Sequence, residues 1–81
     1  MTLDIDRNDQ TLTAVLRGEV RWNDRLLVSS LARLLALSPA TELAVDARHC
    51  TEMDRGSLAG VVSSLERMAL VAGQSFRSVT P

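Results

Sequence analysis

The sequence has few of the residues that catalysis or cross-linking would need. It contains one cysteine, one histidine and two aromatic residues, and all nine basic residues are arginines. The lone Cys50 excludes an internal disulfide and a cysteine-rich metal site. Trp22 and Phe76 are too few for a platform that stacks bases. The net charge is −1, and basic and acidic residues are mixed along the chain. Without a basic face, a nucleic-acid partner is not favoured.

Membrane and secretion signals are also missing. No apolar run reaches the roughly 18 residues that a spanning helix needs. The first residues are acidic and lack the basic and apolar regions of a signal peptide. We therefore expect a cytoplasmic protein without direct membrane insertion.

What is present is regular spacing of apolar residues. Alternation at 3–6 and 11–17, across a polar turn, predicts a β-hairpin. A leucine-rich stretch then predicts a helix that Asn23 or Asp24 caps and that ends at Ser38–Pro39. Its apolar stripe comprises Leu26, Leu27, Leu31, Leu34 and Leu35.

The second half of the sequence predicts a strand, a helix and a final strand. Residues 42–47 are typical of a central strand buried on both faces, and 75–79 of a short last strand. Gly73 is placed to end the intervening helix. The helix has an apolar stripe of Leu58, Val61, Val62, Leu65, Met68, Ala69 and Ala72. We expect one α/β domain over residues 1–81, in the order β-β-α-β-α-β, with helices packed on the sheet.

The segment between Asp46 and the second helix is the candidate site. A polar loop follows the strand, and Asp54, Arg55, Gly56 and Ser57 open the helix. Ligands of open α/β folds bind at such carboxyl ends of strands. Helix N-termini attract negative charge, and an arginine fork can hold a carboxylate or phosphate.

Each of these residues also has a purely structural interpretation. Asp54 is well placed as an N-cap of the second helix. A solvated surface charge is the default interpretation of Arg55, and Gly56 suits a tight turn or the close approach of a partner backbone. Ser57 is typical of a first helical turn that faces solvent.

Nothing in the loop assembles into a catalytic or metal centre. His49 and Cys50 are adjacent, so in an extended segment their side chains point to opposite sides. No second histidine or cysteine completes a metal site or a triad. Asp46 and Asp54 could suggest an acid–base pair, but nothing in the sequence would raise the pKa of one carboxyl above that of the other. We expect no enzyme activity, no metal and no cofactor.

Three segments resemble the STAS domain family, which includes the anti-sigma-factor antagonists and stressosome proteins. TLTAVLRGEV (11–20) resembles the family's second strand, and ELAVDARHCTEMD (42–54) its central strand. DRGSLAGVVSSLERM (54–68) resembles the turn that leads into its second helix. The resemblance implies a STAS-like fold with a mixed four-stranded sheet.

The chain departs from the family at two charged positions and in length. Arg55 stands where partner-switching antagonists carry a phosphorylated Ser or Thr, and Arg21 where the family often has an acidic residue. The nearest hydroxyls, Ser57 and Thr51, are the candidates for a displaced phosphorylation site. The family also continues with another helix after its last strand. Without it, an exposed sheet face would favour a homodimer.

The resemblance implies a protein-binding regulator. We expect it to bind an anti-sigma factor of the serine-kinase type, without phosphorylation at position 55. One alternative is a STAS subunit of a lipid-transport ABC complex, and another is a small ligand-binding protein or enzyme. The expected contact surface comprises Arg21, Trp22, Asp54, Arg55, Gly56, Ser57 and Leu58.

Overall fold

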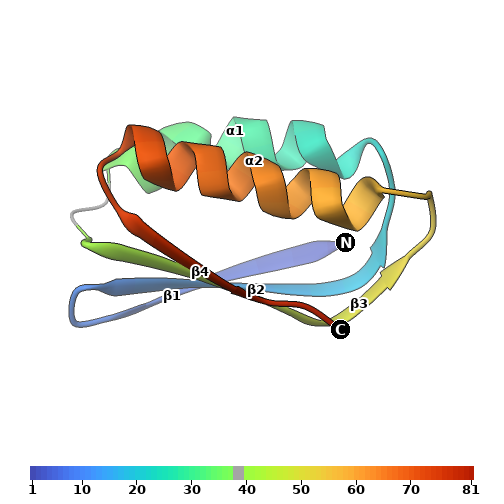
Figure 1. Ribbon diagram of the computed structural model, residues 1–81, viewed down its shortest axis with the longest axis horizontal. Coiled ribbons are helices and arrows are strands. Elements are labelled where there is room, and N and C mark those ends of the chain that lie inside the picture. Colours follow the sequence, from blue (N-terminus) through green and yellow to red (C-terminus); the bar gives the residue numbers. More distant parts are fainter. Residues whose placement is uncertain (38–39) are drawn as a thin grey trace.

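The computed structural model describes the backbone of residues 1–37 and 40–81 and the side chains of residues 1–30 and 40–81. Four strands form one sheet in the order β1-β2-β3-β4, in which β1 and β2 are antiparallel and the other pairs are parallel. The predicted mixed sheet and the order β-β-α-β-α-β are confirmed (Figure 1). The elements are β1 Thr2–Asn8, β2 Thr11–Val20, α1 Asp24–Leu37, β3 Glu42–Glu52, α2 Ser57–Val71 and β4 Ser75–Val79.

Both helices lie side by side on one face of the sheet (Figure 1). The chain moves in one direction from β2 to β3 to β4, and right-handed crossovers then place α1 and α2 on the same face. None of the helices in the described part of the chain is long and apolar enough to cross a membrane.

The other face of the sheet is largely polar. Here Thr13 and Asp46 alternate with the buried residues of their strands, and Glu42 pairs with Arg77 at 3.0 Å between Oε1 and Nη2. Only Ala44 is fully buried among the β3 residues on this side. The prediction that β3 is buried on both faces is therefore wrong beyond this residue. The homodimer stays a prediction, without support from an apolar sheet face.

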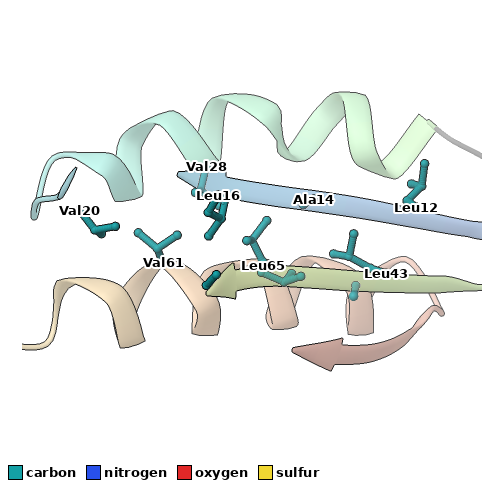
Figure 2. Close-up of a cluster of buried hydrophobic side chains, with 11 residues drawn as sticks. Leu12, Ala14, Leu16, Val20, Val28, Leu43, Val61 and Leu65 are labelled. Atoms are coloured by element: carbon teal, nitrogen blue, oxygen red, sulfur yellow. The ribbon is translucent and has the colours of Figure 1, made fainter. Parts of the chain in front are cut away.

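The core lies between the sheet and the helices, as Figure 2 shows. The predicted alternation on β2 is confirmed, and Val61, Leu65 and Ala69 are the buried positions of the α2 stripe. Ala72 is exposed because the helix ends there. The core comprises Leu12, Ala14, Leu16, Val20, Val28, Leu43, Val45, Ala47, Val61, Leu65 and Ala69.

Strands β2 and β3 are longer than the sequence pattern predicts. Their pairing continues to Val20 and Glu52, so residues 48–52, predicted as loop, are strand. A bulge opposite Val15 and Arg17 shifts the register within this extension. Because the bulge resets which side chains face the core, the alternation that would mark the strand in the sequence is interrupted.

The predicted end of α2 is confirmed. Gly73 has a left-handed φ of +74°, which favours glycine. The Gln74 backbone N–H donates to the Ala69 carbonyl at 2.8 Å, and the Gly73 N–H donates to the Leu70 carbonyl at 3.1 Å. These two bonds form a Schellman motif that satisfies the last carbonyl groups of the helix.

The first helix begins at Asp24, one of its two predicted caps. The Asp24 carboxylate accepts a hydrogen bond from the Arg21 backbone N–H at 2.7 Å, upstream of the helix, and not from an amide of the first turn, so the predicted side-chain cap at Asp24 is wrong. The prediction that Leu26 and Leu27 belong to the buried stripe is wrong, because both are exposed and the buried residue of this turn is Val28. The predicted stop at Ser38–Pro39 and the stripe positions Leu31, Leu34 and Leu35 lie outside the described side chains.

Candidate partner-binding surface

The loops that precede α1 and α2 meet at one end of the sheet. Because β2 and β3 are parallel neighbours, their carboxyl ends at Val20 and Glu52 pair side by side. The Val20 carbonyl accepts hydrogen bonds from the Met53 backbone N–H and from the Ser57 hydroxyl, each at 2.9 Å. Both helices therefore begin at the same end of the molecule (Figure 1).

Asp54 links the two loops. Its Oδ2 accepts a hydrogen bond from the Trp22 backbone N–H at 3.0 Å, across 32 residues of sequence. The prediction that Asp54 caps α2 through its side chain is therefore wrong. A Glu52 carboxylate oxygen instead accepts the Leu58 backbone N–H of the first turn at 3.1 Å. Sequence reasoning missed Glu52 because this contact needs the turn at Asp54 to fold the chain back.

The Trp22 ring lies near two glycines, Gly56 just before α2 and Gly60 within it. A β-carbon at Gly56 would lie 3.5 Å from Trp22 Cη2, and one at Gly60 would lie 3.9 Å from Cζ3. Gly56 also has a left-handed φ of +82°, where another residue would cost about 1–2 kcal/mol. The tight-turn interpretation of Gly56 is thus confirmed, whereas the close approach of a partner backbone stays a prediction; the group near Gly56 in this structure is the Trp22 side chain.

The Arg25 guanidinium lies over the face of the indole. Its guanidinium carbon lies 5.2 Å from the Trp22 ring centroid, which is within the range of a cation–π contact worth about 0.5–1 kcal/mol at exposed sites. Its Cδ would lie 3.4 Å from a β-carbon at Gly60. Trp22 is therefore packed near Gly56, Gly60 and Arg25, with 44% of its surface exposed. Sequence reasoning missed Arg25, although its position three residues after Trp22 was a usable signal.

Ser57 is buried, with 0% of its surface exposed. Its hydroxyl donates to the Val20 carbonyl, so the interpretation that it faces solvent at the helix start is wrong. Through this hydrogen bond, Ser57 links the start of α2 to the end of β2. Thr51, the other predicted phosphorylation candidate, lies on β3 with its side chain exposed, opposite Glu19.

The two arginines of the predicted surface differ in their partners. Arg21 Nη2 lies 3.1 Å from Glu19 Oε2 in an exposed ion pair. Arg55 is exposed, and its side chain makes no hydrogen bond or ion pair with any described residue. Its donors are therefore available to another molecule. We use the name "Trp22 surface" for Arg21, Trp22, Arg25, Asp54, Arg55 and Gly56.

Leu58 lies apart from this cluster, on the sheet-edge side of α2. It is half-buried and lines a shallow groove of about 340 Å³ between α2 and the end of β4. The other lining residues are Glu52, Ala59, Val62, Ser63 and Thr80. The predicted contact set is thus brought to one end of the molecule, but Ser57 and Leu58 do not join the exposed group around Trp22.

The structure separates His49 and Cys50 as the sequence predicts. Cys50 packs against the core, and burial raises the pKa of its thiol, which disfavours the reactive thiolate. His49 is exposed and pairs in register with Arg17. Within residues 1–37 and 40–81, no three His, Cys, Asp or Glu side chains gather in a way that could hold a metal ion.

Asp46 and Arg48 form a compact ion pair on β3. Arg48 donates to the Asp46 carboxylate through Nε at 3.0 Å, Nη2 at 2.9 Å and its backbone N–H at 3.1 Å. These bonds, the side-chain ones first, hold the pKa of Asp46 well below its usual range. Because the folded pKa lies below the unfolded value, the contribution to stability is present above that unfolded value. It is lost as the pH falls through the folded pKa.

We expect Arg48→Gln to raise the Asp46 pKa toward its ordinary value near 3.9, since the cation and two donors are removed. Carboxyl-carbon NMR titration measures this directly. Arg77→Gln, which removes an exposed ion pair with Glu42 on the same sheet face, should leave the Asp46 pKa unchanged. An Asp46 pKa that is the same in the Arg48→Gln and unsubstituted proteins would rule out Arg48 as the cause.

The architecture is similar to the solved structure of the anti-sigma factor antagonist SpoIIAA in its unphosphorylated form. The TM-score is 0.68 with 14% sequence identity, and the match covers 99% of this chain and 70% of that chain. No protein-family profile and no curated protein sequence matches the chain. At this identity the likeness shows the fold alone. The chain therefore has the STAS-like fold that its three sequence segments predicted.

Proposed function

We propose that this protein is a STAS-type regulator that acts by binding another protein through the Trp22 surface. Its partner is an anti-sigma factor of the serine-kinase type, in the cytoplasm, and the protein itself catalyses no reaction. The observation that carries the proposal is the match to an anti-sigma factor antagonist over 99% of the chain.

The Trp22 surface supports this function because it is exposed and internally braced. The Asp54 bond to the Trp22 amide and the packing of the ring on Gly56 fix the indole before any partner arrives. Exposed, preorganised tryptophans are frequent anchors of protein interfaces, since little side-chain entropy is lost on binding. No comparable support exists for a small-molecule site, because the described grooves are shallow and open.

Arg55 makes the proposed binding independent of phosphorylation at that position. A guanidinium carries a permanent positive charge, whereas a phosphoserine would add negative charge beside Asp54. The charge at position 55 is therefore the same whether or not a serine kinase is active. We propose that the protein binds constitutively and lacks the on–off control of partner-switching antagonists.

Affinity capture tests this function. The tagged chain is expected to enrich a serine-kinase-type anti-sigma factor from lysate of the source organism, and calorimetry with the purified partner then gives a Kd. We expect that Kd to be the same with and without ATP. Arg55→Ser restores a hydroxyl at the exposed position, so its binding should weaken when ATP is present.

The outcomes separate the predicted alternatives. Enrichment of an ATPase and a permease without any kinase-type protein would replace the proposal with a transport-complex subunit. Saturable calorimetric heat with a metabolite would favour the ligand-binding alternative. ATP-dependent loss of binding by the unsubstituted protein, with phosphate mapped to Thr51 or Ser57, would show a displaced switch instead of constitutive binding.

A further inference from the structure

Several apolar side chains are exposed around Trp22. Besides the indole, Leu26 is 69% exposed one helical turn further along α1, and Met53 is 43% exposed on the loop before α2. Met53 is fixed close by, because its backbone N–H donates to the Val20 carbonyl. This end of the molecule therefore offers apolar contact area from both loops.

The carboxylates at this end are engaged within the molecule. Each accepts a hydrogen bond from a backbone amide or an arginine, so their acceptor capacity toward a partner is reduced. The pairs are Asp24 with the Arg21 amide, Asp54 with the Trp22 amide, Glu52 with the Leu58 amide, and Glu19 with the Arg21 guanidinium.

Arg25, whose guanidinium lies over the indole, and Arg55, which immediately precedes Gly56, keep most of their donors unused. Arg25 donates only through Nε, to the Trp22 carbonyl at 3.4 Å, while its terminal nitrogens have no described partner. Arg55 adjoins Gly56, which contacts the edge of the ring, and bonds to no described residue. The Trp22 surface therefore offers a partner unused arginine donors from both loops, next to an exposed apolar centre.

We propose that the Trp22 surface binds an acidic protein segment whose central side chain is apolar. The partner's carboxylates pair with Arg25 and Arg55, and its apolar side chain packs on the Trp22 ring. This deepens the proposed function by assigning the chemistry of the partner's contact. Carboxylate pairs at an exposed rim contribute mainly specificity and association rate, and the apolar centre contributes most of the affinity.

Trp22 is the only tryptophan, so its fluorescence reports occupancy of this surface without a label. The probe is a synthetic peptide with Asp and Glu on both sides of a Leu-Phe pair. Its counterpart carries Asn and Gln at the same positions. We expect a saturable emission change with the acidic peptide and at least about tenfold weaker binding of the amide peptide, because the charge pairing is lost.

The double variant Arg25→Glu, Arg55→Glu should weaken acidic-peptide binding by at least about tenfold, since attraction becomes repulsion. Arg67→Glu is the matched control, because Arg67 is exposed near the other end of α2 and should leave binding unchanged. Single reversals distinguish the two cations, and Arg55→Glu leaves the Trp22 packing intact.

Absence of saturation at millimolar acidic peptide, or equal binding of the two peptides, would overturn the acidic-segment proposal. It would leave the proposed regulatory function standing if the captured anti-sigma factor still binds. Conversely, acidic-peptide binding that depends on Arg25 and Arg55, without capture of any kinase-type partner, would support this docking chemistry and remove the proposed function.

Discussion

Ser57→Glu is expected to unfold the protein, whereas Thr51→Glu is expected to be tolerated. Ser57 has no exposed surface, and its hydroxyl lies 2.9 Å from the Val20 carbonyl oxygen. A carboxylate there would be buried against a carbonyl, at a penalty of several kcal/mol. The total stability of a domain of this size is only about 4–12 kcal/mol. The burial penalty is therefore a large fraction of the free energy of unfolding.

Urea unfolding followed by circular dichroism measures the difference. Ser57→Ala, which removes only the hydroxyl, is the control and should cost only about 1 kcal/mol, because the Val20 carbonyl keeps the Met53 N–H as a donor. Thr51→Glu should change stability by less than about 1 kcal/mol, including repulsion from Glu19 opposite. A Ser57→Glu protein with the unsubstituted unfolding midpoint would show that the Ser57 side chain is not confined as described.

The result also bears on phosphorylation. A phosphate is larger and more highly charged than a carboxylate, so modification of Ser57 would require the start of α2 to separate from Val20. The exposed hydroxyl of Thr51 faces no such barrier. Of the two predicted sites of displaced phosphorylation, the fold therefore favours Thr51.

Trp22→Ala is expected to weaken binding to the protein partner by about 30-fold or more. Truncation of a central interface tryptophan commonly costs about 2 kcal/mol or more, and each 1.4 kcal/mol is tenfold in Kd. The ring's support by Gly56, Gly60 and Arg25 gives it the rigidity that such anchors need. Calorimetry with the captured partner provides the comparison.

Leu70→Ala is the matched control for this substitution. Leu70 is an apolar residue with 62% of its surface exposed, but it lies at the opposite end of α2. It should leave the Kd unchanged. Asp54→Ala removes the acceptor of the Trp22 amide and should weaken binding less than Trp22→Ala, because the indole remains but is less firmly placed. Equal affinities for Trp22→Ala and the unsubstituted protein would exclude Trp22 as an anchor.

Periodic apolar spacing predicted the order of the elements and most of the core. Leu12, Ala14 and Leu16 are buried because a half-buried strand alternates, and Val61 and Leu65 because a helix repeats every 3.6 residues. The end of β3 was missed because the bulge interrupts the alternation there. The spacing of apolar residues therefore predicts a strand only as far as a bulge, beyond which different residues face the core.

The sequence predicted where the candidate surface lies in the fold, but not the contacts that its residues make. The loop residues Asp54, Arg55 and Gly56 were identified because strand ends and helix starts coincide there. The bond from Trp22 to Asp54 spans 32 residues, and no local pattern encodes such a contact. The same holds for Ser57, whose burial depends on where the Val20 carbonyl lies.

The most direct test of the Trp22 surface as the binding site is NMR. The ¹⁵N-labelled protein is titrated with the unlabelled captured partner, and amide shifts are followed. The largest perturbations should cluster at residues 21–26 and 53–57, with the polar sheet face around Thr13 and Arg77 unaffected. Perturbations centred on that sheet face, with the Trp22 amide and indole unchanged, would contradict the assignment of the partner to this end of the molecule.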